Sequence, residues 1–329
     1  MPELPEVETT KTSLTPLLGQ RLVDVKVFQP KLRWMMPDDL NRLVGYTLDR
    51  VERRAKYLIL NFSPITADNP IHADNTVHAD NTITAEPDTA APCQLMIHLG
   101  MSGSLQQHKI GTEKRKHDHL IMVFTDTDNS KTQLHYYDPR RFGSVLWFAD
   151  YGHKLLDHLG PEPLTEEFTA EYLYRFIQRL NLNEKNTTAN VSDTEHTGKR
   201  YKPIARAIKS VIMEQEVVVG VGNIYATESL FLSRIHPATP ANQLSYKQIE
   251  VLVSHIKTIL QKAITLGGST LRDFTVASGQ TGYFQQTLNV YGRQGETCLN
   301  CDTILENIKL TGRASVYCPT CQPMPSLVL

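Results

Sequence analysis

Residues 297–322 read TCLNCDTILENIKLTGRASVYCPTCQ and hold four of the five cysteines of the chain. They form two Cys-x2-Cys pairs, Cys298 with Cys301 and Cys318 with Cys321, and 16 residues separate the pairs. Paired motifs at this separation are typical of four thiolates on one tetrahedral zinc ion. A chain without a secretory signal disfavours disulfides, and a thioredoxin-like redox pair needs only one such motif. We therefore expect a small zinc ribbon with one structural Zn2+.

Helical periodicity dominates the residues that precede this ribbon. From about Thr165 the apolar side chains recur at three- and four-residue spacing, and Ser245 is a suitable cap for the last helix. Residues 220–222 read GVG and lead into Asn223, and a glycine turn before a helix N-terminus exposes N–H groups that suit a phosphate. Helix packing is the alternative role for these glycines. The predicted helices cover residues 165–180, 203–214, 223–234 and 245–266.

The first half of the chain has a β pattern. Short runs rich in Val, Ile, Leu and aromatic residues alternate with Gly, Asp or Pro, which is typical of strands. A helix is predicted ahead of them over residues 7–18, because apolar residues recur at helical intervals until Gly19. The fifth cysteine, Cys93, stands at a strand start and is expected to be a buried apolar side chain. The predicted strands cover residues 21–28, 57–62, 94–99, 119–125, 133–137 and 144–148.

Two polar segments interrupt these patterns. Residues 64–92 hold five acidic side chains, no Lys or Arg, and three copies of a six-residue unit, ADNPIH, ADNTVH and ADNTIT. Three short repeats without caps cannot bury a continuous core, so we expect a disordered loop expansion rather than a β-helix. Residues 183–197 are expected to be a second flexible insertion. Subtracting the −5 and −2 of these segments from the net −1 of the chain leaves +6 for the rest, so the neutral balance does not exclude a nucleic-acid partner.

Length and composition favour an ordinary globular protein. The chain has 329 residues, of which 40% are hydrophobic and 21% charged, and this length suits about two domains and a small third one. No stretch reaches the roughly 18 consecutive apolar residues of a membrane span, and the first residues are acidic where a secretory signal is basic. We expect a cytoplasmic protein with no membrane partner.

The N-terminus carries candidate chemistry. A small second residue normally permits removal of Met1, which would leave Pro2 with a free secondary amine. Such an amine can attack an electrophilic sugar carbon and yield an iminium, and its pKa of about 8 leaves a neutral fraction at physiological pH. Glu3 and Glu6 lie close by in sequence and are suited to proton transfer. The alternative is an ordinary helix start, where Pro and acidic residues are common.

A series of motifs runs along the whole chain. They are MPELPEVET (1–9), RRAKYL (53–58), HLGMSGSL (98–105), KHDH (116–119), DPRRFG (138–143), HLGPEPL (158–164), VVGVGNIYATESLF (218–231), GGSTLRDF (267–274), GYFQ (282–285) and VYGR (290–293). Together with the zinc ribbon, and in this order, they resemble the bacterial formamidopyrimidine-DNA glycosylases. The resemblance extends from Pro2 to Gln322 and is interrupted only by the two polar segments.

This resemblance implies an α+β multidomain fold and a DNA-repair activity. The implied domains are an N-terminal β-sandwich with a leading helix (1–150), a helical helix–two-turn–helix domain (151–278) and a four-cysteine zinc ribbon (279–323), followed by a tail (324–329). The implied enzyme is a bifunctional DNA glycosylase and AP lyase of base-excision repair that removes oxidised purines such as 8-oxoguanine and formamidopyrimidines. Its implied partner is double-stranded DNA containing oxidised bases. We expect a monomer that needs no cofactor besides zinc and is associated with the nucleoid when bound to DNA.

The resemblance also assigns catalytic roles. Pro2 corresponds to the nucleophile that attacks C1′, Glu3 to the acid that protonates the sugar ring oxygen, and Glu6 to a supporting carboxylate. Lys56 corresponds to the lysine associated with β-elimination. Arg313 corresponds to the zinc-hairpin arginine associated with δ-elimination and with the phosphates that flank the lesion.

Further residues correspond to DNA contacts. A base that leaves the helix creates a void, and Met101, Arg140 and Phe142 are similar to the residues with which the family fills it. Core packing is the alternative for Met101 and Phe142, but Met101 lies between glycines, where we expect a loop tip. The other residues that the resemblance assigns to DNA binding are His117, Lys202, Asn223 and Tyr283.

Two other functions remain open. An enzyme of the related endonuclease VIII type prefers oxidised pyrimidines, but Leu4 stands where those relatives typically have Gly. A DNA-binding zinc protein without catalysis is the second alternative. The presence of Pro2, Glu3 and Lys56 favours an enzyme instead.

Overall fold

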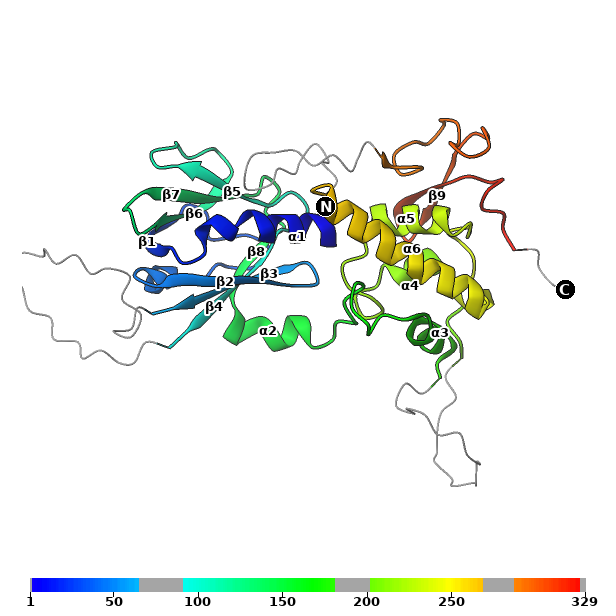
Figure 1. The fold of residues 1–329 in the computed structure, drawn as a ribbon, viewed down its shortest axis with the longest axis horizontal. Helices are drawn as coiled ribbons and strands as arrows, with labels where there is room; N and C mark the ends of the chain where they lie inside the picture. Colours follow the sequence, from blue (N-terminus) through cyan, green and yellow to red (C-terminus); the bar gives the residue numbers. More distant parts are fainter. Residues whose placement is uncertain (1, 65–90, 181–201, 269–286, 326–329) are drawn as a thin grey trace, which may run out of the picture. The chain divides into compact units, whose positions relative to one another are not determined.

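The computed structural model describes residues 2–64, 91–180, 202–268 and 287–325. The chain divides into two compact units, Met1–His158 with Leu266–Gln285 and Leu159–Thr265 with Gln286–Leu329. The first unit holds the large sheet, and the second holds most of the helices and a small hairpin (Figure 1). Among the described residues, no helix is long and apolar enough to cross a membrane.

In the described part of the first unit, eight strands form one sheet: β1 (Arg21–Val27), β2 (Thr47–Arg54), β3 (Tyr57–Ser63), β4 (Cys93–His98), β5 (Ser104–Lys109), β6 (Asp118–Thr125), β7 (Lys131–Tyr137) and β8 (Ser144–Trp147). Their order is β5-β7-β6-β1-β2-β3-β4-β8, and every neighbouring pair is antiparallel. Between β1 and β2 the described residues give a single register pair, Arg21↔Thr47. The sheet therefore consists of two four-stranded halves that are joined at one corner.

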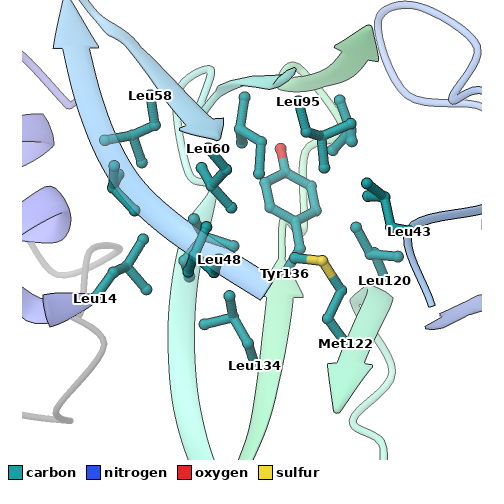
Figure 2. Packing of buried hydrophobic residues seen from close by; sticks show 14 of the residues in the cluster. Leu14, Leu43, Leu48, Leu58, Leu60, Leu95, Leu120, Met122, Leu134 and Tyr136 are labelled. Atoms are coloured by element: carbon teal, nitrogen blue, oxygen red, sulfur yellow. The ribbon is translucent and has the colours of Figure 1, made fainter. Parts of the chain in front are cut away.

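The two halves enclose a common apolar core. Leu58 and Leu60 of β3 meet Leu134 and Tyr136 of β7 in it, and all four are fully buried (Figure 2). Cys93 packs against the same cluster and is partly buried. Because removal of apolar surface from water stabilises a fold by about 25 cal/mol per Å2, this core holds the two halves face to face. The unit is thus the predicted β-sandwich.

Two α-helices accompany the sandwich, α1 (Leu4–Ser13) and α2 (Phe148–Leu156), together with the 3-10 turns Thr15–Leu17 and Leu40–Leu43. A capping box starts α1, in which the backbone N–H of Glu3 donates to Oε2 of Glu6 at 2.9 Å. Pro5 follows within the first turn, where a helix needs no backbone donor. The Nε of Arg53 in β2 donates to Oε2 of Glu8 at 2.6 Å, so α1 is fixed to the sheet.

The second unit contains α3 (Ala170–Gln178), α4 (Ile208–Ile212), α5 (Asn223–Leu232), α6 (Tyr246–Thr265) and the 3-10 turn Ala241–Gln243. The long helix α6 packs against α3 and α5 (Figure 1). Its N-terminus has the predicted cap, because the N–H of Gln248 donates to Oγ of Ser245 at 3.3 Å and the N–H of Ser245 donates to Oε1 of Gln248 at 3.0 Å. This pair of hydrogen bonds is a second capping box.

A two-stranded hairpin of β9 (Glu306–Leu310) and β10 (Arg313–Tyr317) ends the second unit. A buried carboxylate of α5, that of Glu228, accepts hydrogen bonds from the backbone N–H groups of residues 289–291 at 2.8–2.9 Å. A buried cation of α4 holds the hairpin itself, because Nζ of Lys209 donates to the carbonyl of Ala314 at 2.9 Å and to Oγ of Ser315 at 2.7 Å. The helices therefore fix both the entry to the ribbon and β10.

The α+β multidomain fold predicted from the sequence is confirmed, with differences in its elements. Six strands lie where they are predicted, within two residues at each end. The sequence does not predict β2, β5 or α2. The helix predicted from Thr165 begins at Ala170, where Thr169 caps it, and the helix predicted over 203–214 is only the single turn of α4. The two polar segments, predicted to be disordered, lie almost entirely outside the described residues.

Candidate active site and DNA-binding surface

The N-terminus of α1 brings together three of the predicted catalytic residues. Pro2 is buried, and the side chains of Glu3 and Glu6 are each only 2% exposed. The positive end of the helix dipole favours both carboxylates at this position. Gly268 packs against Glu6, since a Cβ added to it would lie 3.3 Å from Oε1 of Glu6. Once Met1 is removed, the amine of Pro2 would stand next to two buried acids at a helix start, an arrangement suited to nucleophilic attack with proton transfer.

Lys56 lies in the two-residue turn between β2 and β3. Ala55 adopts a left-handed conformation there, with φ of 54°, and Nη1 of Arg53 donates to its carbonyl at 2.9 Å. Burial raises the pKa of Glu8, but hydrogen bonds from Lys11 and Arg53 outweigh it and keep the pKa below its usual value. Glu8 therefore remains charged and anchors the turn to α1 through Arg53. Lys56 itself is 9% exposed, so a mostly buried cation is held on this turn.

His98 ends β4 opposite this turn and controls the next loop. Burial, followed by the nearby charges of Lys56 and Arg33, lowers the pKa of His98 from 6.5 to about 4. The ring is thus neutral at physiological pH, and its Nδ1 accepts a hydrogen bond from the N–H of Gly100 at 3.0 Å. This bond directs the chain into the turn that carries Met101. His98 belongs to a quoted motif, but the sequence gives it no role.

The predicted void-filling residues occupy two adjacent loops of the first unit. Met101 lies in a turn and is partly exposed, as the glycines around it predict. Phe142 is 46% exposed, and the guanidinium of Arg140 lies 5.1 Å from the centre of its ring. The backbones of the two loops touch, because a Cβ on Gly100 would lie 2.4 Å from the carbonyl carbon of Phe142. An apolar chain, a guanidinium plane and an aromatic ring are therefore displayed side by side.

His117 stands beside these loops in a basic depression. Two lysines and an arginine share a cavity of 440 Å3 with it, over the ring of Phe28. The residue after it, Asp118, is fully buried and forms an ion pair with Arg115 at 2.8 Å, which fixes the loop. Positive side chains around a concave surface suit the phosphates of DNA. The basic side chains that line this cavity are Lys114, Lys116, His117, His119 and Arg141.

The second unit holds three more of the predicted residues. Asn223 is the first residue of α5, and its buried Oδ1 has no hydrogen-bond partner among the described residues. Because the two atoms of an amide are not distinguished, this side chain has hydrogen-bonding capacity left for a ligand at the helix N-terminus. Lys202 is exposed, and Arg313 is exposed at the start of β10. Tyr283, the remaining predicted contact, lies outside the described residues.

The four cysteines of the ribbon converge as predicted. All four Sγ atoms lie within 4.8 Å of one another, and three of the Sγ–Sγ distances are 3.9, 3.5 and 3.5 Å. Thiolates bound tetrahedrally at about 2.3 Å from zinc lie about 3.8 Å apart, so the geometry fits. Backbone N–H groups of Asn300 and Cys321 also donate to Sγ of Cys298 and Cys318 at 3.4 Å. The cluster is a site for a structural metal ion.

The sequence does not identify several residues that organise the candidate site. His98, Glu228 and Lys209 are buried or partly buried polar residues that organise the loops and the ribbon. Asp138 and Ser102, which lie beneath the loops that carry Met101 and Phe142, also carry no predicted role. All of these except Lys209 stand in a quoted motif, but a single sequence does not show that a polar side chain is buried.

Comparison with known proteins agrees with this organisation. Residues 1–145 match the model of the formamidopyrimidine-DNA glycosylase N-terminal domain, residues 182–275 the formamidopyrimidine-DNA glycosylase H2TH domain, and residues 295–323 a zinc finger found in FPG and IleRS. The formamidopyrimidine-DNA glycosylase of Psychrobacter arcticus is 66% identical over 99% of this chain and 100% of its own length. That of Acinetobacter baylyi is 49% identical over 98% and 99%.

Solved structures show the same likeness. A Lactococcus lactis FPG mutant in complex with Fapy-dG-containing DNA is 31% identical, with a TM-score of 0.74 over 98% of this chain and 100% of that chain. The MutM (FPG) protein of Thermus thermophilus is 30% identical, with a TM-score of 0.73 over the same shares. The likeness to these proteins extends over nearly the whole length of the chain. The chain therefore belongs to the formamidopyrimidine-DNA glycosylase family.

Proposed function

We propose that this protein is a bifunctional DNA glycosylase and AP lyase of base-excision repair that removes oxidised purines, chiefly 8-oxoguanine and formamidopyrimidines. The observation that carries the proposal is the N-terminus of α1, where buried Pro2 adjoins two desolvated carboxylates in a chain of this family. Relatives bear the name formamidopyrimidine-DNA glycosylase, and the Lactococcus lactis protein has been solved with Fapy-dG-containing DNA.

The first chemical step is displacement of the damaged base. After removal of Met1, the lone pair of the Pro2 nitrogen forms a bond to C1′ as the glycosidic bond breaks, and the base leaves with the electron pair of the glycosidic bond. The Pro2 ammonium then loses its N–H proton to solvent or to the departing base. Glu3 protonates the ring oxygen, and the restored nitrogen lone pair opens the sugar, so the Pro2–C1′ bond becomes an iminium. Glu6, which accepts the N–H of Glu3 at 2.9 Å, holds the acid in place. Water hydrolyses the iminium and releases Pro2 only after the strand cleavage described next.

Strand cleavage follows from the iminium, because it acidifies the proton on C2′. Loss of that proton expels the 3′ phosphate by β-elimination, and we assign Lys56 to this step. A second elimination releases the 5′ phosphate, and we assign Arg313 to it and to the flanking phosphates. Lys56 lies in the β2–β3 turn, and Arg313 is the first residue of β10, directly after the turn from β9; such positions suit groups that act at fixed places.

Recognition requires that the lesion leave the helix. We assign Met101, Arg140 and Phe142 to the void that the base leaves, because they project from touching loops and combine apolar, planar and aromatic surfaces. Phosphate contacts give affinity without sequence preference. The residues assigned to these and other DNA contacts are His117, Lys202, Asn223 and Tyr283.

The metal is assigned as one structural Zn2+ on Cys298, Cys301, Cys318 and Cys321, because four thiolates at tetrahedral spacing suit zinc. Zinc would hold the ribbon that carries Arg313, and no other cofactor is needed for the proposed chemistry. We further propose that the enzyme acts as a monomer in the cytoplasm, at the nucleoid when bound to DNA.

Covalent trapping tests the proposal. Borohydride reduces an iminium to a stable amine, so the protein with an 8-oxoguanine duplex should give a covalent adduct, whereas a non-catalytic binder gives only a shifted complex. The Pro2→Gly variant should lose trapping and nicking but keep its zinc content and duplex affinity, because a primary amine without the ring is a poorer, less constrained nucleophile. Unchanged activity in this variant would exclude Pro2 as the nucleophile.

Substrate comparison tests the lesion class. Incision of 8-oxoguanine duplexes should exceed incision of dihydrouracil duplexes under the same conditions, because we place the enzyme in the purine-directed branch. The reverse order would favour the endonuclease VIII type. Mass spectrometry of the active chain should show that Met1 is absent and that Pro2 carries no blocking group.

A further inference from the structure

One buried carboxylate, that of Asp138, lies beneath both loops that carry the void-filling residues. It is fully buried, and its two oxygens contact different loops. Oδ1 accepts a hydrogen bond from Oγ of Ser102 at 2.8 Å, directly after Met101. Oδ2 accepts the backbone N–H of Gly143 at 2.9 Å, directly after Phe142. A single side chain thus bridges the residues that follow the two loop tips.

Ser102 extends this bridge to the third void-filling residue. Its hydroxyl, 2% exposed, donates to Asp138 and also accepts the backbone N–H of Arg140 at 3.3 Å. The hydroxyl therefore uses both its donor and its acceptor capacity between the two loops. Breaking either hydrogen bond would leave a buried polar group without a partner, so this link is well suited to hold a loop position.

The surroundings of Asp138 leave little freedom for the loops to separate. The hydroxyl of Tyr136 approaches Oδ2 at 3.4 Å, and burial together with Asp138 raises the pKa of Tyr136 well above 10, so it stays a donor. The main chain of Asp138 is fixed as well, since its N–H donates to the carbonyl of His117 at 3.0 Å and its carbonyl pairs with Nε2 of His119 at 2.7 Å. The same residue thus connects the basic depression to the loop tips.

We propose that Asp138, acting through Ser102, is a positioning residue that makes Met101, Arg140 and Phe142 enter the duplex as one rigid wedge. The inference rests on the proposed function, and it adds which residues hold the three side chains in place before they enter the duplex. Opening a base pair costs a few kcal/mol, and loops that must first be ordered would add their own entropic cost to each extrusion. Asp138 touches no reacting atom in this scheme. Its contribution is confined to the step in which the base leaves the stack.

The test compares a substrate that needs the wedge with one that does not. Ser102→Ala removes the hydroxyl link and leaves Asp138 and Gly143 in place. It should lower kcat/KM about tenfold to a hundredfold on 8-oxoguanine paired with cytosine, but less than about threefold on a preformed abasic site, which has no base to extrude. Ser104→Ala is the matched control, because Ser104 is also 2% exposed and hydrogen-bonded, but to Gln106. It should leave both rates within about twofold.

A second, milder variant keeps the test informative if Ser102→Ala does not fold. Asp138→Asn keeps the shape and one carbonyl acceptor, so it should show the same asymmetry between the two substrates with a smaller loss. Fluorescence of 2-aminopurine placed opposite the lesion should report slower opening of the pair in both variants.

Parallel losses on both substrates, in either variant, would overturn the proposal, because they indicate general destabilisation. Unchanged rates on the paired substrate in Ser102→Ala would overturn it as well. These outcomes do not contradict the proposed function, provided that borohydride traps the covalent adduct between the wild-type protein and the 8-oxoguanine duplex. A wild-type protein that is not trapped would overturn the function and the inference together.

Discussion

Gly100 tests how closely the two loops that carry Met101 and Phe142 are packed against each other. It has φ of +65°, and a Cβ added there would lie 2.4 Å from the carbonyl carbon of Phe142 and 2.5 Å from the nitrogen of Gly143. These are backbone atoms, which cannot rotate away. Gly111 is the matched control, because it has φ of +85° in the turn after β5 but nothing within 4 Å of an added Cβ.

The two alanine variants therefore separate strain from clash. Alanine with a left-handed backbone costs about 1 kcal/mol relative to glycine, so Gly111→Ala should lower the free energy of unfolding by about 1 kcal/mol. Forcing a methyl group into close-packed atoms adds about 1–3 kcal/mol, so Gly100→Ala should cost about 2–4 kcal/mol in all. For a unit of this size the difference corresponds to several degrees in Tm, about 2–4 °C for each kcal/mol.

Thermal and urea denaturation of both variants measure this difference. Gly100→Ala should also impair incision of paired 8-oxoguanine more than Gly111→Ala does, because Met101 and Phe142 are displaced. Equal losses of stability in the two variants would show that the loops do not touch as described, and would refute the packing on which the wedge depends.

Three further predictions concern other parts of the molecule. The pKa of His98 is about 4 in the folded state, against 6.5 for an ordinary histidine. The neutral ring therefore contributes about 3 kcal/mol to the free energy of unfolding above pH 6.5, and this contribution is lost as the pH falls through about 4. Urea titrations of His98→Asn at several pH values should lack this acid-dependent loss. Lys209→Met should lower the free energy of unfolding by about 2 kcal/mol, measured by the same titrations, because the carbonyl of Ala314 and the hydroxyl of Ser315 lose a buried donor. Chelation of the ribbon metal should abolish duplex binding in a fluorescence-anisotropy assay, while the sandwich retains its circular dichroism. The reason is that Cys298 and Cys318 belong to the small apolar cluster of the ribbon and not to the sandwich core. Loss of both signals together would contradict this separation.

The elements that sequence reasoning finds are those with a strong apolar pattern. β6 is buried along its entire length and β3 almost so, and both are predicted. β2 reads TLDRVERR, and a register shift between Leu48 and Arg50 breaks the alternation that would have revealed it. β5 reads SLQQHK, in which buried Ser104 and Gln106 look like surface residues. Burial of polar side chains depends on partners that are distant in sequence, so the pattern alone does not show it.

The candidate site likewise contains residues that the sequence identifies and residues that only the fold reveals. The cysteine pairs are recognisable because zinc imposes a fixed spacing, and their convergence is confirmed. The predicted roles of Pro2 and Lys56 depend on the resemblance and stay predictions until the variants are measured. Asp138 and Ser102 are 36 residues apart in the chain, and only the fold places their side chains 2.8 Å from each other.

The pairing of β3 with β4 also determines where this chain tolerates added length. Tyr57 pairs with His98 at the end of the strands that holds the Lys56 turn, and Phe62 pairs with Cys93 at the other end, about 17 Å away at 3.3 Å per residue. Residues 64–92 connect the strands at this remote end. Closing a longer connection costs only about 0.6 kcal/mol for each doubling of its length. A dye or affinity tag attached at Ser63 or Cys93, the ends of the strands themselves, would therefore be held about 17 Å along the sheet from the Lys56 turn.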